Sequence, residues 1–330
     1  MTRSRQAVML LITLTTVATV GGQAGASAAA SAPNSATSAV ATVNGTAATD
    51  AGSTGAALEA YWTPERMRSA IPADKPAAVP TGSTGSTSDK PTGPATVAAA
   101  PQAASVKATD RANLNVNASI TVGKIFFHDE SDGKDYVCSG STINNPTKNI
   151  VVTAGHCVHG GKGKKWHTNW QFVPYYDHGS RPYGTWWAKQ LTSFKGWTQN
   201  GSYDWDLAFV NVWPNGSTRL VDQVGGNGLI VNYAKNLYVT LLAYPAGAPY
   251  DGSWQYACQG NMYAYGSEQV GFNCLLTGGA SGGPFLYQYS DATGLGYVDS
   301  VISHGPDTIN YGPYFDTDVL NLYNGVANYS

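Results

Sequence analysis

Ile-Val-Val-Thr-Ala-Gly-His-Cys, residues 150–157, is a short apolar run that passes into small residues and ends on His156 beside Cys157. Val and Ile are enriched in β-strands, so the run predicts a strand whose end carries an imidazole at the edge of a sheet. Histidine suits proton transfer, because a pKa of about 6.5 lets it take and return a proton at neutral pH. A lone histidine is more often a packed structural residue, but the pattern over 153–157 favours a catalytic one.

A second pattern, Asp-Leu-Ala-Phe-Val at residues 206–210, places a carboxylate at the start of an apolar run. A buried carboxylate is costly unless it is paired. Its most useful partner would be the far ring nitrogen of His156, since that contact fixes the tautomer and stabilises the imidazolium. Asp204 would share the same face, but Asp206 directly adjoins the apolar run and is preferred. Without the histidine pattern, a surface aspartate at a strand start would be the better interpretation.

A third pattern, Gly-Gly-Ala-Ser-Gly-Gly-Pro at residues 278–284, surrounds Ser281 with glycine. A nucleophilic serine needs an exposed hydroxyl and backbone N–H groups that converge on a developing oxyanion. Glycine permits backbone angles that turn such donors inward, and the donors expected here are the N–H groups of Gly279 and Ser281. Alone, a Gly/Ser-rich loop is usually only a loop. The preceding His156 and Asp206, in this order, favour a catalytic site.

From residue 113 onward the sequence has the pattern of an all-β protein. Short runs rich in Val, Ile, Phe, Tyr and Trp alternate with Gly, Asn, Asp and Pro. The runs do not alternate with long amphipathic helices, which argues against a parallel α/β sheet, and many short antiparallel strands fit closed barrels or a sandwich. We expect strands at residues 121–127, 135–143, 150–153, 169–174, 184–190, 206–212, 238–244, 283–287 and 297–303, and a terminal helix within 316–328.

The N-terminus has the pattern of an export signal: Arg3 and Arg5, then an apolar stretch over 7–20, then small residues suited to a signal peptidase. We therefore predict a signal peptide at residues 1–28. The apolar stretch is shorter than the ~20 residues that a membrane span needs. We expect a secreted, extracellular protein with no membrane association after signal removal. An N-terminal membrane anchor is the alternative.

Residues 29–112 are dominated by Ala, Ser, Thr, Gly and Pro. Few large apolar side chains are available to offset the entropy of ordering, so the composition predicts a low-complexity, largely disordered pro-segment. One island, ALEAYWTPERMRSAIP at 57–72, is different. In it, Thr63 followed by Pro64 and Glu65 is typical of a helix N-cap with proline at the first helical position. The island is either a docking element or a weakly helical piece of linker.

Charge and cysteine content narrow the function classes. The net charge is −2 and no long basic stripe is present, so nucleic acid binding is not expected. Four cysteines in an exported chain indicate two disulfides, with three possible pairings of Cys138, Cys157, Cys258 and Cys274. A zinc site is the competing idea, because His156 and His159 lie near Cys157. No second Cys or His pair has a zinc-like spacing, so no metal is expected.

The order histidine, aspartate, serine resembles the trypsin/chymotrypsin superfamily of serine peptidases. The segments VGKIFF, YVCSGSTI, TAGHC, DLAFV, TGGASGGPF and YGPYF resemble a secreted bacterial branch near the glutamyl-endopeptidase-like (V8-like) enzymes, and so does YWTPERMRSAIP. The resemblance implies a chymotrypsin-like peptidase domain over residues 113–330. It would consist of two antiparallel six-stranded β-barrels, at about 113–225 and about 226–330, with the active site between them and a short C-terminal helix.

The resemblance also implies roles and pairings. Ser281 would be the nucleophile, His156 its base and Asp206 the residue that orients the imidazole, with the oxyanion bound by the amides of Gly279 and Ser281. Cys138 would pair with Cys157, leaving Cys258 to Cys274. The partners would be protein or peptide substrates of a monomeric enzyme, and the chemistry requires no cofactor.

Two positions depart from the trypsin pattern. Trypsin-like enzymes usually have an aspartate directly before the nucleophile, which pairs with a newly cut N-terminus and orders the oxyanion loop, but here the residue is Ala280. The loop must therefore be ordered by other means, and we expect maturation to relieve blockage by the pro-segment. Leu275 stands where trypsins carry an acidic residue, so a preference for Lys or Arg loses its electrostatic basis.

The sequence leaves two possibilities for the substrate residue that the specificity pocket prefers. The spacing Thr277-Gly-Gly before Ala280 resembles the glutamate-cutting branch, where a pocket histidine helps to bind the substrate carboxylate, and His304 is a counterpart for it. Leu276 stands where that branch tends to place a hydroxyl residue. Acidic and apolar-or-small preferences both remain, as does an ordinary strand-end role for His304.

Three functions follow from these patterns. The first is peptide-bond hydrolysis by a secreted serine endopeptidase made as a zymogen. The second is a catalytically silent protease homologue that acts as a secreted binding module. The third is a cell-wall stalk protein whose Ala/Thr/Ser-rich segment spaces a domain from the surface.

Overall fold

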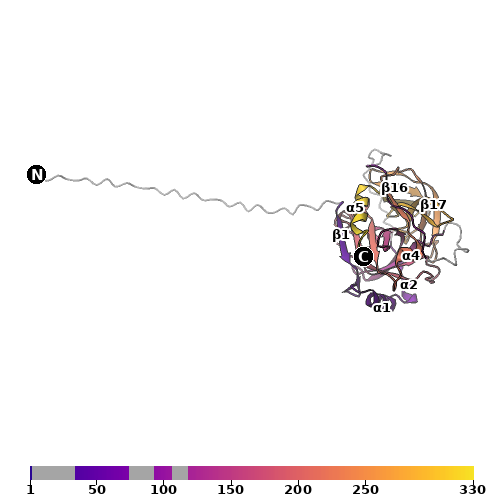
Figure 1. The fold of residues 1–330 in the computed structure, drawn as a ribbon, viewed down its shortest axis with the longest axis horizontal. Coiled ribbons are helices and arrows are strands. Elements are labelled where there is room, and N and C mark those ends of the chain that lie inside the picture. Colours follow the sequence, from indigo (N-terminus) through magenta and orange to yellow (C-terminus); the bar gives the residue numbers. More distant parts are fainter. Residues whose placement is uncertain (2–33, 74–92, 106–117) are drawn as a thin grey trace. The chain divides into compact units, whose positions relative to one another are not determined.

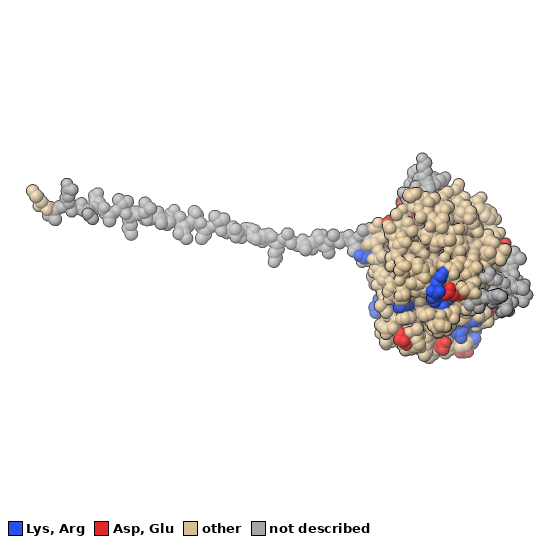
Figure 2. Space-filling model, in the orientation of Figure 1, with Lys and Arg blue, Asp and Glu red and all other residues tan. Residues whose placement is uncertain are grey.

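The computed structural model describes Met1 and residues 34–73, 93–105 and 118–330. The predicted signal peptide, residues 1–28, lies outside the described residues apart from Met1. Within the described ranges, no helix has the length and apolar character that crossing a membrane requires. On the face shown in Figure 2, charged side chains of the described residues are few and scattered, in keeping with a charged fraction of 12%.

Six antiparallel strands form a closed barrel in the first half of the β region (residues 118–330). Hydrogen bonding runs in the order β10-β11-β8-β7-β6-β9, and β9 returns to β10 through the pairs Trp186 with Phe172 and Trp187 with Gln171. Val, Ile, Leu and Phe side chains of these strands point inward and are fully buried, as the alternation of a closed sheet requires. The strands are β6 (Val122–Asp129), β7 (Lys134–Ile143), β8 (Ile150–Thr153), β9 (Thr168–Pro174), β10 (Trp186–Phe194) and β11 (Ala208–Val212).

The second half of the β region contains two further sheets. One has the order β14-β13-β17-β18-β12-β5, in which β5 (Thr96–Ala99) comes from the N-terminal part of the chain, and the other has the order β15-β16-β19. β12 pairs with β18 in parallel. The expected all-β class with a closed barrel is therefore confirmed, whereas the second half is divided into two sheets and is not purely antiparallel. Its strands are β12 (Gly228–Val231), β13 (Tyr238–Ala243), β14 (Tyr256–Asn261), β15 (Tyr263–Tyr265), β16 (Gln269–Asn273), β17 (Pro284–Ser290), β18 (Leu295–Val301) and β19 (Ile309–Pro313).

Helices in the β region are short, and the terminal one confirms the prediction. α5 (Thr317–Val326) begins after Asp316, whose carboxylate accepts from the backbone N–H groups of Asp318 and Val319. Its apolar side buries Leu322 and Tyr323 against the main core. The others are α3 (Lys195–Thr198), α4 (Leu220–Val224) and the 3₁₀ turns η2 (Gly155–Cys157) and η3 (Tyr203–Trp205).

The N-terminal segment (residues 29–112) is ordered over 34–73 and 93–105, so the prediction of a largely disordered segment is wrong for these ranges. Its strands extend sheets of the β region: β1 pairs with β10, β4 with β7 and β5 with β12. The composition of the segment did not predict this structure, because the segment packs against the β region and not against itself. Its elements are β1 (Ala36–Val40), β2 (Thr42–Val43), β3 (Thr46–Ala47), α1 (Ala51–Tyr61), α2 (Pro64–Ser69), β4 (Ile71–Pro72) and β5 (Thr96–Ala99).

The apolar island of this segment docks onto the first barrel through α1 and α2, which both lie toward one edge of the fold in Figure 1. Leu58 and Trp62 are each 1% exposed, and Trp62 Nε1 donates to Asn169 O at 2.7 Å. Thr63 caps α2, since its Oγ1 accepts from Arg66 N at 3.2 Å. The structure thus has the expected N-cap and favours the docking interpretation over a loose linker.

Candidate active site

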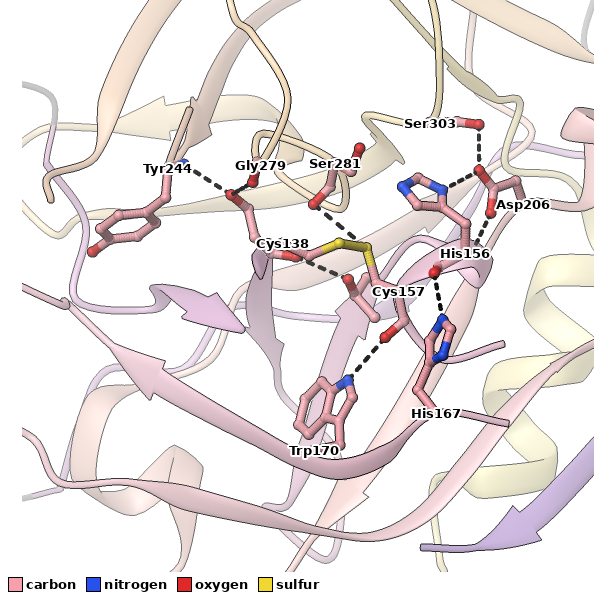
Figure 3. Close-up of a disulfide and its surroundings, with 12 residues drawn as sticks. Cys138, His156, Cys157, His167, Trp170, Asp206, Tyr244, Gly279, Ser281 and Ser303 are labelled. Carbon is pink, nitrogen blue, oxygen red and sulfur yellow. Dashed lines mark hydrogen bonds and ion pairs between the residues drawn. A yellow bond between two sulfur atoms is a disulfide. The ribbon is translucent and has the colours of Figure 1, made fainter. Parts of the chain in front are cut away.

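His156 lies where β8 passes into the 3₁₀ turn η2, at the edge of the first barrel (Figure 3). Both its backbone and its ring contact one carboxylate: His156 N donates to Asp206 Oδ1 at 2.7 Å, and Nδ1 lies 2.7 Å from Oδ2. An ionised Asp206 accepts from Nδ1–H, so the ring takes the tautomer that leaves Nε2 able to accept a proton. The predicted His156–Asp206 pair is brought together.

Asp206 follows η3 and is completely buried. Besides the two His156 donors, its Oδ2 accepts from Ser303 Oγ at 2.6 Å. Burial pushes the pKa of this carboxyl upward, but the charge of His156 and the hydrogen bonds outweigh it, so the net shift is downward and the group stays ionised at neutral pH. Asp204, the alternative candidate, instead binds Gln269 Nε2 and lies outside this network.

Ser281 lies in the glycine loop (residues 278–284), in which two positions have backbone angles that favour glycine. Gly279 and Gly282 have φ angles of +89° and +83°, a left-handed region that side chains rarely adopt. A Cβ on Gly282 would lie 2.2 Å from both Ser139 O and Thr153 Oγ1. The glycines therefore press the loop against the first barrel, where His156 is.

Ser139, on strand β7, holds the loop in place of the missing acidic side chain at position 280. Its Oγ donates to Gly279 O at 3.0 Å and accepts from Tyr244 N at 2.8 Å, and its backbone N–H donates to Ser281 O at 2.7 Å. Ala280 itself is fully buried. The loop is thus ordered by neutral hydrogen bonds from the first barrel, without an ion pair.

Ser281 Oγ and His156 Nε2 are both buried, and neither has a hydrogen-bond partner among the described residues. Figure 3 shows the Nε2 edge of His156 turned toward the Ser281 side chain. Buried polar atoms are rarely left unsatisfied, and functional sites are among the exceptions. His156 and Asp206 thus come from the first half of the β region and Ser281 from the second, and the ring and the serine side chain face each other.

The predicted oxyanion donor Gly279 already binds an acceptor. Its N–H donates to Ala73 O, the residue after β4, at 3.2 Å. Ala73 N in turn donates to Val137 O at 3.0 Å, so the N-terminal segment continues its pairing with β7 up to the glycine loop. A backbone carbonyl has no sequence signature, and sequence reasoning did not find this contact.

The cysteines pair as the resemblance implied. Cys138–Cys157 joins β7 to η2 directly beneath the site, and Cys258–Cys274 joins β14 to the segment before the glycine loop. Within the described ranges, the sole cluster with metal-binding side chains close together is Cys138, His156 and Cys157. Its sulfurs are bonded to each other and its histidine is held by Asp206, so the cluster does not fit a metal ion.

Three of the predicted specificity residues lie just before the glycine loop. Leu275 is 44% exposed, whereas Leu276 is 1% exposed and packs in an apolar core cluster. Thr277 is buried, and its Oγ1 donates to Gly247 O at 2.7 Å. Leu275 therefore faces solvent, while the side chains of Leu276 and Thr277 are engaged within the second half.

The fourth, His304, is fully buried and reaches the site through Ser303. Its ring stacks on Tyr203 with the centroids 4.3 Å apart, and Nδ1 lies 3.2 Å from Ser303 Oγ, which donates to Asp206. Sequence reasoning missed Ser303, because a serine at a strand end carries no local signal for a contact across 97 residues.

No family model matches the sequence. Among solved structures, the thermostable serine protease AL20 from an extremophilic microorganism is 31% identical with a TM-score of 0.61, covering 65% of this chain and 100% of that chain. Protease Anisep from Arthrobacter nicotinovorans is 34% identical with a TM-score of 0.59, covering 69% and 99%. A Glu endopeptidase is 17% identical with a TM-score of 0.53, covering 64% and 94%, a likeness of fold alone.

A curated relative is also similar, over a smaller share of the sequence. The extracellular metalloprotease of Bacillus subtilis (strain 168) is 26% identical over 189 residues, or 56% of each chain. This chain thus spans about half the length of that relative. The word metalloprotease describes that protein, and the disulfide-bonded cluster described above does not offer this chain a metal site.

Proposed function

The chain belongs to the trypsin/chymotrypsin-like superfamily of serine peptidases, and from this premise we propose that it is a secreted serine endopeptidase that cleaves peptide bonds through an acyl-enzyme. The observation that carries the proposal is that the Nε2 edge of the Asp206-bonded His156 ring faces the unbonded Ser281 side chain (Figure 3). The superfamily alone would be compatible with an inactive homologue, but a silent protein has no need to keep a buried, charge-stabilised imidazole beside an unbonded serine hydroxyl.

In the proposed mechanism, His156 Nε2 takes the proton of Ser281 Oγ as that oxygen bonds to the scissile carbonyl carbon. The carbonyl oxygen becomes an oxyanion held by the N–H groups of Gly279 and Ser281, while the Asp206 carboxylate stabilises the imidazolium. The imidazolium passes its proton to the departing amine as the C–N bond breaks. Water then attacks the acyl-enzyme with His156 again as base, which releases the acid and restores Ser281.

We further propose that residues 29–112 act as a pro-segment that keeps the enzyme a zymogen. Ala73 O occupies the N–H of Gly279 that the oxyanion would need. The segment is anchored nearby at Asp135, whose carboxylate accepts from Tyr61 OH at 2.7 Å and from Arg66 Nε at 2.5 Å. Blockage by a docked segment offers a means of control that does not need an acidic residue at position 280.

Fluorophosphonate labelling of the secreted protein tests the nucleophile. We expect the wild type to be labelled at Ser281, Ser281→Ala to be unlabelled, and Ser131→Ala to label normally, since Ser131 is an exposed serine of the turn between β6 and β7. Labelling that survives Ser281→Ala would defeat the assignment. Absence of labelling in the wild type, before and after removal of the N-terminal segment, would favour the silent binding module.

The timing of labelling tests the pro-segment. Protein recovered with residues 29–112 attached should label slowly, and Arg66→Ala should label faster because it loosens the contact with Asp135. N-terminal sequencing of the extracellular protein would place the signal and pro-segment cleavage sites. Equal labelling rates with and without the segment would contradict its inhibitory role.

A further inference from the structure

A cavity of about 640 Å³ lies beside the glycine loop, between the N-terminal segment and the β region. Ala70 and Pro72 line it from the segment, and Lys124, Tyr176 and Ala246 from the β region. None of the four predicted specificity residues lines it. The cavity adjoins the site, because a Cβ on Gly278 would lie 3.2 Å from the Cβ of Pro72, and one on Gly279 would lie 3.0 Å from that of Ala246.

Lys124 is an unusual wall residue, since lysine is rarely buried and its side chain here is only 5% exposed. Its ammonium lies about 5 Å from the rings of Phe126 and Tyr176, and it donates to Gly252 O at 2.7 Å. The Lys124 ammonium has three N–H donors, and among the described residues the Gly252 carbonyl is the one acceptor that it contacts. Burial lowers its pKa to about 8, so the group still carries its charge at neutral pH.

The charges around the cavity favour an anion. On the β-region side, Lys124 and Arg181 face one acidic lining residue, Asp251, whose carboxylate accepts from Ser253 N at 2.9 Å. A buried cation is costly unless an opposite charge compensates it, and the charge of Asp251 offsets only part of the effect of burial on the Lys124 pKa. A ligand that brings a carboxylate into the cavity would supply that charge and use the remaining Lys124 donors.

The N-terminal segment marks the path that a peptide can take past this cavity. Ile71 and Pro72 pair with Tyr136 and Val137 along the free edge of β7. Residues two apart in an extended chain point to the same side, which matches the presence of both Ala70 and Pro72 in the lining. Both side chains are small and uncharged, so the cavity above Lys124 stays open. A substrate strand on the same edge would place a longer side chain there.

We infer that Lys124, assisted by Arg181, forms a subsite that binds a Glu or Asp side chain of the substrate at a position flanking the scissile bond, separate from the pocket for the cleaved residue. The inference rests on the proposed function, since it assigns a substrate preference to the same active site. It makes Lys124 a specificity-determining residue that no catalytic step uses.

The test compares the cleavage of paired peptides by the secreted protein. The peptides share one cleavable bond and differ only by Glu against Gln, placed in turn at each position on either side of it. We expect kcat/KM to favour Glu over Gln by about tenfold at one position away from the cleaved residue. Lys124→Met should bring that ratio close to one, Lys124→Arg should keep part of it, and the exposed control Lys165→Met should leave it unchanged.

Outcomes against the inference are distinct from failure of the proposed function. A Glu/Gln ratio near one at every flanking position in the wild type, or a ratio that survives Lys124→Met, would overturn the subsite while leaving the peptidase in place. If Lys124→Met does not fold, Arg181→Gln and added salt should each lower the ratio, and no change in either would count against it. No cleavage of any peptide, together with no labelling of Ser281, would defeat the proposed function and the subsite with it.

Discussion

The two halves of the candidate site are held by different forces. His156 and its ring orientation depend on one buried carboxylate, Asp206, which receives three hydrogen bonds. Ser281 depends on backbone shape, because Gly279 and Gly282 adopt left-handed angles and Gly282 packs closely against the first barrel. The first half is therefore sensitive to changes of charge, and the second to changes of volume.

Each half is also fastened by a serine from the other. Ser139, on β7 of the first barrel, bonds Gly279 O and Ser281 O in the glycine loop. Ser303, which follows β18 in the second half, donates to Asp206. These reciprocal contacts keep the proposed base and nucleophile in register across the boundary between the halves.

The largest effect is expected from Asp206→Asn, which removes the negative charge beside His156 and keeps the shape of the side chain. An amide that donates toward Nδ1 would favour the wrong imidazole tautomer, so kcat should fall by about 10⁴-fold while the protein stays folded. Steady-state kinetics with a peptide substrate would measure it. Asp204→Asn is the matched control, two residues away and outside the network, and comparable losses in both variants would contradict the assignment.

Gly282→Ala tests the Ser281 side of the site, because it adds the volume of a methyl group without changing any charge. The new methyl group would lie 2.2 Å from Ser139 O and Thr153 Oγ1 on a backbone with positive φ, and the free energy of unfolding should drop by about 3–5 kcal/mol. Gly216→Ala separates clash from strain, since its φ is +61° with nothing within 4 Å. Urea unfolding of both variants gives the comparison, and equal losses would mean that the close contact is unimportant.

Two buried carboxyl groups, one in the candidate site and one outside it, differ in how they are compensated. Asp206 and Asp299 are both fully buried, but neither carboxylate oxygen of Asp299 has a hydrogen-bond partner among the described residues, and burial raises its pKa to about 8. A raised folded-state pKa means that its contribution to stability is complete below the unfolded value of 3.8 and is lost as the pH rises toward 8. Asp206, with its lowered pKa, acts in the opposite direction.

Asp299→Asn should therefore gain stability over the wild type as the pH rises from 4 to 8, by on the order of a few kcal/mol. The measurement is the difference in Tm between the two proteins across that range. The neutral amide has the same shape, so packing differences stay constant with pH. A difference that does not change with pH would show that Asp299 is not held in its protonated form.

Ser303→Ala should have the smallest effect, because Asp206 keeps both of its contacts with His156. We expect kcat to fall by about tenfold, the worth of one hydrogen bond to a charged group. On acidification the variant should lose activity at higher pH than the wild type, since Asp206 loses a donor that lowers its pKa and is then protonated sooner. Ser303→Thr should restore most of the rate, and an unshifted profile would reduce Ser303 to a packing role.

Local patterns were good predictors where a single run of residues contains the whole signal. Each of the nine expected strands overlaps an observed one, and the N-caps at Thr63 and Asp316 behave as short-range rules require. Five strands of the second half were missed: β12, β14, β15, β16 and β19. β14 is half-exposed and contains Gly, Ala, Gln and Asn, so its strand conformation comes from pairing with neighbours and not from propensity, and β15 is only three residues long.

The sequence by itself determined the strand-to-histidine turn at residues 150–157, the buried acid at Asp206 and the glycines around Ser281, because each is written in neighbouring residues. Only the tertiary structure decided what joins them: the contacts of Ser139 and Ser303 across the site, the folding of the N-terminal segment onto the β region, and the hydrogen bond from Gly279 N–H to the Ala73 carbonyl. These contacts link residues from about a hundred to two hundred positions apart, and their energy comes from surfaces that exist only once both partners have folded.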